Sequence, residues 1–167
     1  MKNKVFISHS SKDGEYVRAL IELLEGIGLS EEDLFCSSIP EYGIPLNKNI
    51  YDYLANEFRT NNLIVLYTLS DHYYASAACL NEMGAAWVLK KTYSSILLPG
   101  FNYKEIEGAI DPCKIGIKLD ADQAELKYRL GELKDLLIEQ LSLRPISSGK
   151  WERYRDKYIN EVQSLKK

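Results

Sequence analysis

Short apolar runs alternate along the chain with longer stretches in which apolar residues recur at helical spacing. Runs of four to eight residues that end at turn residues are typical of buried strands. Such runs predict strands at 4–8, 33–37, 62–69, 94–98 and 114–119. The run at 62–69 is the longest of the five, as expected for a central strand that helices cover on both sides.

The stretches between these runs carry the spacing of amphipathic helices. The first helix is marked by apolar residues three or four positions apart: Val17, Leu20, Ile21, Leu24 and Ile27. Ser10 or Ser11 can cap its start, and Gly28 is a stop signal. Further helices are predicted at about 47–59, 75–89, 120–143 and 151–165, with a short helical turn near 103–109.

Five alternations of strand and helix predict an α/β fold with a parallel sheet covered on both faces. The flavodoxin-like doubly wound arrangement, with strand order 2-1-3-4-5, suits five such units. We expect one domain over 1–143. A linker and a C-terminal helix follow over 144–167, and they either pack on this domain or lead to a further domain.

Polar residues follow the first three predicted strands. Because the carboxyl ends of parallel strands share one edge, we expect these residues to frame a ligand site near the switch point between strands one and three. Hydroxyls and backbone N–H groups at a helix start suit a phosphate or pyrophosphate. The candidate binding residues at this edge are His9, Ser10, Ser11, Ser37, Ser38 and Ser70.

Glu82 is the only charged residue between Asp71 and Lys90. On a helix its neighbours are mostly small: Ala75, Ala78, Cys79, Ala85, Ala86 and Leu89. Burying an ionised carboxylate without a partner costs several kcal/mol or raises its pKa. Glu82 therefore either lines a pocket or reaches solvent or a distant Lys or Arg as a structural residue.

The amino-acid composition of the chain argues against several classes of function. A net charge of −3 argues against a nucleic-acid partner, which usually selects a basic face. Three separated cysteines form neither a disulfide framework nor a zinc motif, and they fit a reducing, cytoplasmic compartment. We expect no signal peptide and no membrane segment, because apolar runs stay far below the ~20 residues of a membrane span.

Single residues argue for or against three other functions that occur on a similar fold. A receiver domain needs an acceptor Asp where this chain has Leu69-Ser70, and it is rejected. A flavin site is a weaker alternative that rests on the serines after the first strand and on the aromatic pair Tyr73-Tyr74. A nucleoside deoxyribosyltransferase-like enzyme also stays open. Cys79 is a nucleophile candidate, but without a nearby His it is better interpreted as a core residue.

Three ordered blocks resemble the Toll/interleukin-1 receptor (TIR) domain family over roughly 3–143. They are Val5 to Asp13, the loop from Ser37 to Leu46, and Leu69 to Met83 with its Cys79-x-x-Glu82 spacing. The resemblance implies the same doubly wound fold. Members of the family are either non-catalytic interaction scaffolds or enzymes that cleave NAD+ with a glutamate at the position of Glu82. Because Glu82 is present at this spacing, the resemblance implies the second function, in the form found in bacteria, with the scaffold as the alternative.

For an NAD+-cleaving member, the resemblance implies Glu82 as the catalytic residue and NAD+ as a substrate, with no cofactor and no metal. Nicotinamide is released, and either ADP-ribose or a cyclic ADP-ribose isomer forms; the role that the resemblance implies is bacterial antiphage or immune signalling. Cys79, one turn before Glu82, joins the candidate binding residues. Many active members carry an aromatic four residues before the glutamate, where this chain has Ala78, and Tyr42 is our candidate substitute.

The loop at 38–46 is also the expected self-association surface. TIR domains often complete their site with a neighbouring subunit, so the resemblance implies a homo-oligomer through this loop and neighbouring helices. Apolar Ile39, Tyr42 and Ile44 are expected to be exposed there. The alternative is that these three side chains fold back over the sheet edge.

Overall fold

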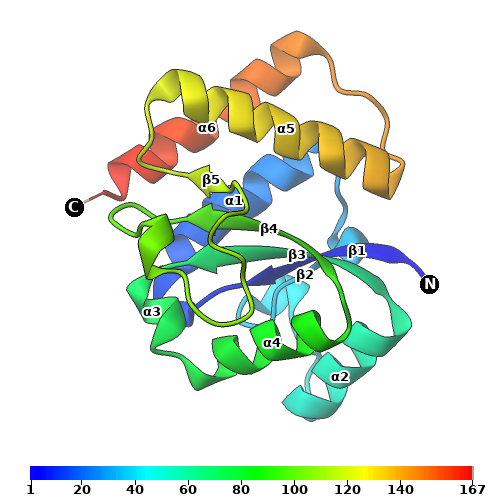
Figure 1. The fold of residues 1–167 in the computed structure, drawn as a ribbon. Coiled ribbons are helices and arrows are strands. Elements are labelled where there is room, and N and C mark those ends of the chain that lie inside the picture. The colour runs from blue at the N-terminus through cyan, green and yellow to red at the C-terminus, as the bar shows by residue number, and fades with distance from the viewer. Residues whose placement is uncertain (167) are drawn as a thin grey trace.

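A parallel sheet forms the centre of residues 1–166, which the computed structural model describes (Figure 1). Its strands within that range, in spatial order, are β2 (Leu34–Phe35), β1 (Asn3–Ser8), β3 (Asn62–Leu69), β4 (Thr92–Leu97) and β5 (Ile117–Lys118). All neighbouring pairs are parallel. The predicted doubly wound order 2-1-3-4-5 is confirmed.

Helices form a layer on each side of the sheet (Figure 1). One layer contains α1 (Gly14–Ile27), α5 (Gln123–Leu141) and α6 (Ser148–Ser164). The other contains α2 (Ile50–Thr60), α3 (Asp71–Tyr74) and α4 (Ala77–Val88). Short 3-10 turns lie at η1 (Ser11–Asp13), η2 (Glu31–Asp33), η3 (Pro40–Tyr42) and η4 (Tyr103–Glu105).

The alternation of side chains along β1 decides which residues reach each layer. Val5 and Ile7 pack into the core beneath α1, α5 and α6. Phe6 packs into the second core, beneath α2, α3 and α4, beside Phe35 and Phe58. Ser8 lies two residues after Phe6, so its hydroxyl points into the second layer at the carboxyl end of the strand.

The observed elements differ from the predicted ones mainly at their ends. The strands predicted at 33–37 and 114–119 pair over two residues each, β2 and β5, because they form the edges of the sheet. The helix predicted at 75–89 starts at Ala77, where the Ser76 hydroxyl accepts a hydrogen bond from the Cys79 N–H. A separate short helix, α3, precedes it, and the turn predicted at 103–109 is limited to Tyr103–Glu105.

The C-terminal helix α6 packs on α1. Lys157 Nζ lies 2.6 Å from the Glu22 carboxylate, and Tyr158 and Val162 are buried in the first core. The ring of Tyr154 covers Gly26 so closely that a Cβ at this position would lie 2.6 Å from ring carbons. Among residues 1–166, no helix is both long and apolar enough to cross a membrane.

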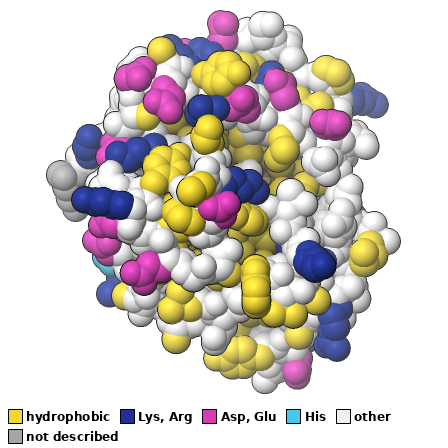
Figure 2. Space-filling model, viewed as in Figure 1, with side chains coloured by type: hydrophobic (Ala, Val, Ile, Leu, Met, Phe, Trp, Pro, Cys, Tyr) yellow, Lys and Arg dark blue, Asp and Glu magenta, His cyan; other side chains and the backbone are white. Residues whose placement is uncertain are grey.

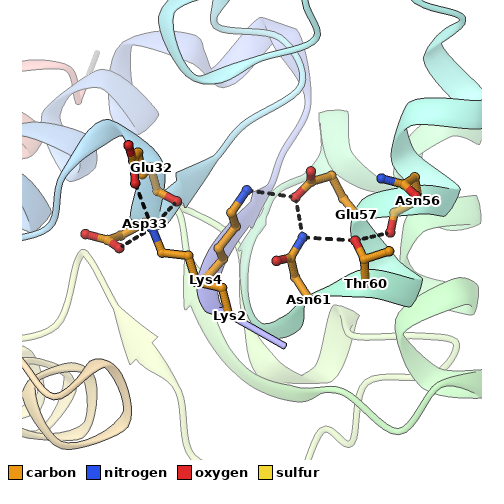
Figure 3. A network of polar contacts seen from close by, with 8 residues as sticks. All are labelled: Lys2, Lys4, Glu32, Asp33, Asn56, Glu57, Thr60 and Asn61. Atoms are coloured by element: carbon orange, nitrogen blue, oxygen red, sulfur yellow. Dashed lines mark hydrogen bonds and ion pairs between the residues drawn. The ribbon is translucent and has the colours of Figure 1, made fainter.

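A buried ion pair ties α2 to strand β1 (Figure 3). Lys4 Nζ lies 3.1 Å from the Glu57 carboxylate, and Glu57 is only 6% exposed. The Asn61 amide donates to the same carboxylate oxygen at 3.0 Å. Losing either partner would leave a buried charge, so this contact holds the C-terminal half of α2 at a defined place beside the sheet.

We predict that Gly26→Ala destabilises the protein by about 1–3 kcal/mol, because the new methyl group overlaps the Tyr154 ring and forces α6 away from α1. The measurement is chemical denaturation. Gly131→Ala on α5 is the matched control: its Cβ meets nothing within 4 Å, so the same change should stabilise by about 0.5–1 kcal/mol. Equal effects at the two glycines would contradict the packing of α6 on α1.

Candidate functional site

A cleft of about 570 Å³ runs between α2 and α4. This volume lies in the range of small-molecule sites, which span roughly 300–1,000 Å³. Most of its wall is apolar, with a few polar groups among the side chains. The lining residues are Ser37, Ile50, Tyr51, Leu54, Ala55, Phe58, Arg59, Ala78, Asn81, Glu82, Ala85 and Leu89.

Glu82 projects from α4 into this cleft and is half-buried. Burial raises the pKa of its carboxyl group to about 7, and hydrogen bonding from Ser8 and Ser37 opposes that rise. The Ser8 hydroxyl donates to Glu82 Oε2 at 2.6 Å. The described structure therefore supports the interpretation of Glu82 as a pocket-lining carboxylate that titrates near neutral pH.

Small residues on α4 create the space around this carboxylate. Ala78 and Ala85, one turn before and one turn after Glu82, both line the cleft. On the opposite side of α4, Cys79 and Met83 are buried in the core beneath the helix. The sequence pattern of small neighbours around Glu82 thus corresponds to open volume on one side of the helix and to close packing on the other.

A chain of hydroxyls continues from Glu82 into the core. Ser8 Oγ lies 2.9 Å from the Tyr73 hydroxyl, whose single proton can be donated to Ser8 or to the Cys79 carbonyl 3.1 Å away. The carboxylate is therefore held from β1 and α3 as well as by its own helix. Ser8 is not among the binding residues predicted from the sequence, and Tyr73 was considered there only as part of the aromatic pair of the flavin alternative.

His9 and Ser38 form a pair of their own beside the cleft. Ser38 Oγ lies 2.6 Å from His9 Nε2, and His9 is 7% exposed. Burial lowers the pKa of His9, so the imidazole is neutral at pH 7. Nδ1 lies 3.5 Å from the Ile7 carbonyl, so we assign the ring hydrogen to Nδ1. Nε2 then accepts a hydrogen bond from the Ser38 hydroxyl.

The remaining serines at the sheet edge serve local structure. Ser10 caps η1 through the Lys12 N–H, and Ser11 is the exposed first residue of that turn. Ser70 caps α3 and donates to the buried carboxylate of Asp13, which also accepts from His72 at 2.9 Å. Of the predicted binding residues, the cleft contains Ser37; it does not contain His9, Ser10, Ser11, Ser38 or Ser70.

The cysteines fit structural roles. Cys79 is buried, burial raises the pKa of its thiol to about 11, and it does not line the cleft. Cys36 is fully buried, with its sulfur 3.6 Å from His9 Nδ1 and a thiol pKa raised to about 12 by burial. Cys113 is exposed on the loop before β5. Within residues 1–166, no cluster of three His, Cys, Asp or Glu side chains could hold a metal ion.

The prediction for the loop at 38–46 needs correction. Ile39 is 3% exposed, Ile44 packs against the second core, and Tyr42 packs against the first core while its hydroxyl donates to Glu25 of α1. The three side chains thus fold back over the sheet edge, and Tyr42 does not line the cleft. Two aromatic residues line the cleft: Phe58, which is buried in its floor, and Tyr51, whose side chain is 72% exposed.

Comparisons with known proteins place the chain near one bacterial protein. No family model matches. The uncharacterized protein YddK of Bacillus subtilis (strain 168) is 42% identical over 165 residues, which are 98% of this chain and 58% of that protein. This chain therefore spans little more than half the length of that relative. Among solved structures, the TIR domains of the activated Roq1 resistosome, which directly recognizes the pathogen effector XopQ, are similar at 15% identity and a TM-score of 0.47. That alignment covers 98% of this chain and 84% of the other.

The raised pKa of Glu82 predicts a pH-dependent stability. The unfolded chain releases this proton near pH 4.5 and the folded protein near 7, so the stabilising effect of the protonated form is full below 4.5 and is lost as the pH rises through 7. Glu82→Gln removes the ionisation. The variant should gain roughly 1–3 kcal/mol relative to wild type between pH 5 and 8, at about 1.4 kcal/mol per pKa unit reduced by partial exposure.

Urea unfolding at several pH values measures this difference. Glu15→Gln, a change at an exposed carboxylate on α1, is the control and should run parallel to wild type. Ser8→Ala removes a donor to the carboxylate and should shift the loss of stability to higher pH. Parallel curves for wild type and Glu82→Gln would show that Glu82 titrates normally.

Proposed function

We propose that this chain is a TIR-type NAD+ nucleosidase that releases nicotinamide. The observation that carries the proposal is a single one: Glu82 stands in an open, largely apolar cleft, held by Ser8, at the position where the TIR resemblance implies the catalytic glutamate. The doubly wound sheet is the fold that this resemblance implies.

The chemistry suits one carboxylate. Hydrolysis of an ordinary glycoside needs a general acid, because the leaving oxygen must be protonated. The nicotinamide of NAD+ is already cationic and leaves as a neutral base. A carboxylate beside the ribose can therefore act without an acid partner, by binding ribose hydroxyls and stabilising the oxocarbenium-like charge that develops as the bond breaks.

The environment of Glu82 supports this role. Desolvation weakens competing interactions with water, so a negative charge in the cleft acts strongly on a nearby positive charge. With a pKa of about 7, the carboxylate is partly protonated in the free protein at neutral pH. A cationic nicotinamide ring bound beside it favours the ionised form, which is the form that stabilises the transition state.

Water attack on the ribosyl intermediate gives ADP-ribose, and attack by an adenine nitrogen or a ribose hydroxyl gives a cyclic isomer. A cytoplasmic role in bacterial antiphage or immune signalling fits such products. We further propose that the protein acts as a homo-oligomer. Exposed apolar side chains lie both on the helices and at the end of the loop at 38–46, because Trp87 and Val88 at the end of α4 are 66% and 67% exposed and Leu46 is 89% exposed.

A non-catalytic TIR scaffold is the alternative function, and one observation favours it. Hydrophobic side chains reach the surface over α4 (Figure 2). Next to Trp87 and Val88 lies a second hollow of about 550 Å³, which also contains Tyr67 and Tyr93 and has no carboxylate in its wall. Exposed apolar surface of this kind often marks a protein contact. A scaffold predicts no turnover of NAD+.

Incubation of concentrated protein with NAD+, followed by chromatography, tests the reaction. We expect nicotinamide release by wild type and a loss of at least about 100-fold in Glu82→Gln, which keeps the shape but removes the charge that stabilises the transition state. Mass spectrometry of the same mixture separates ADP-ribose from its cyclic isomers.

Glu15→Gln serves as the matched control and should retain wild-type turnover. Circular dichroism and unfolding curves should show that Glu82→Gln is folded. Turnover that survives Glu82→Gln unchanged would remove Glu82 from the reaction. Base exchange from deoxynucleosides without action on NAD+ would instead identify a deoxyribosyltransferase.

Tyr51 supplies the second prediction for turnover. Its ring lines the cleft that contains Glu82 and Ala78, and it stands on the facing helix, where it can stack on the nicotinamide in place of the missing aromatic at 78. Tyr51→Ala should raise the KM for NAD+ by roughly three- to tenfold, the loss of one aromatic contact, whereas Tyr51→Phe should stay near wild type. Tyr42→Ala should leave the KM unchanged, and the reverse pattern would return the stacking role to Tyr42.

A further inference from the structure

The cleft between α2 and α4 carries opposite charges on its two walls. Glu82 on α4 supplies the carboxylate, and Arg59 near the end of α2 supplies a cation. Between them the wall is mostly apolar, with Leu54, Ala55 and Ala85. A ligand that fits this arrangement has a positive or hydroxyl-rich part, a compact body and an anionic group.

Arg59 has hydrogen-bond donors to spare. Its Nε donates to the Ala55 carbonyl at 3.1 Å, and among residues 1–166 its guanidinium forms no ion pair. The nearby carboxylate of Glu57 is engaged by Lys4 and Asn61 beside the sheet (Figure 3). Glu57 and Arg59 are two residues apart, so their side chains point to different sides of the helix.

The spacing along the cleft suits a dinucleotide. The C-terminal ends of α2 and α4 are neighbours, because Lys91 Nζ donates to the Asn61 carbonyl at 2.9 Å. Leu89 lines the cleft at the C-terminal end of α4, seven residues after Glu82. Seven residues correspond to on the order of 10 Å along a helix. A ribose with its phosphoester link covers much of that length, and Arg59 lines the same cleft from the facing helix.

We propose that Arg59 binds the diphosphate of the dinucleotide whose nicotinamide ribose lies at Glu82. This inference rests on the proposed function and adds the direction in which the substrate lies, along α2 toward its C-terminal end. The planar guanidinium forms paired hydrogen bonds to phosphate oxygens, and the apolar walls of the cleft strengthen them. Lys91, whose Nζ donates to the Asn61 carbonyl just after α2, adds positive potential at the same end.

Calorimetric titration with ADP-ribose tests the subsite without turnover. We expect Arg59→Gln to weaken ADP-ribose binding roughly 10- to 100-fold, the usual effect of losing a charged hydrogen bond. Arg59→Lys keeps the positive charge but loses the planar guanidinium that forms paired hydrogen bonds. Its affinity for ADP-ribose should therefore lie between that of wild type and that of Arg59→Gln. In turnover, Arg59→Gln should raise the KM for NAD+ by a similar factor and leave kcat within about twofold, because the diphosphate contact is the same in ground and transition states.

Arg18→Gln, at an exposed arginine on α1 in the other layer, is the matched control and should bind and turn over as wild type. ADP-ribose binding that is within twofold of wild type in Arg59→Gln, or that is absent from wild type, would overturn the subsite. The two proposals fail separately. Binding that depends on Arg59 without nicotinamide release keeps the subsite and removes the reaction, whereas release that is indifferent to Arg59 keeps the reaction and removes the subsite.

Discussion

The hydrogen bond from Ser8 to Glu82 joins the two parts of the molecule on which the candidate site depends. It connects the carboxyl end of strand β1 to the middle of α4, at 2.6 Å. A half-buried carboxylate needs such a donor to be ionised at all near neutral pH. Ser8 can supply it because the pleat of β1 turns its hydroxyl to the same side as Phe6, toward the layer that contains the cleft.

The cleft itself results from unequal packing within that layer. Phe58 and Met83 fill the space next to the sheet, while Ala78 and Ala85 leave the space above it open. Such a gap survives only if its walls cannot collapse toward each other. The buried pair Lys4–Glu57 fixes α2, and the Ser8 contact fixes α4, so both walls are tied to the same strand.

The sequence predicted the fold well because strands buried on both faces and helices with one apolar face have distinct periods. From the small residues around Glu82 it gave a pocket as one of two possible places for this carboxylate. The binding residues were harder to predict from the sequence. Serines at the ends of strands look alike in sequence, yet Ser70 and Ser10 satisfy helix N-termini and Ser37 reaches the cleft. The roles of Tyr42 and Tyr51 depend on how one loop folds back, which local pattern does not encode.

The burial of Cys36 and Cys79 has a practical consequence for spectroscopy. Their thiols are enclosed and have raised pKa values, so they react slowly with maleimides, which attack the thiolate. Cys113 is exposed on a surface loop, outside the cleft. Of the three cysteines in the sequence, it is therefore the one that a fluorophore will label. The natural chain thus provides its own attachment point for a dye, on the loop before β5, without any engineered cysteine.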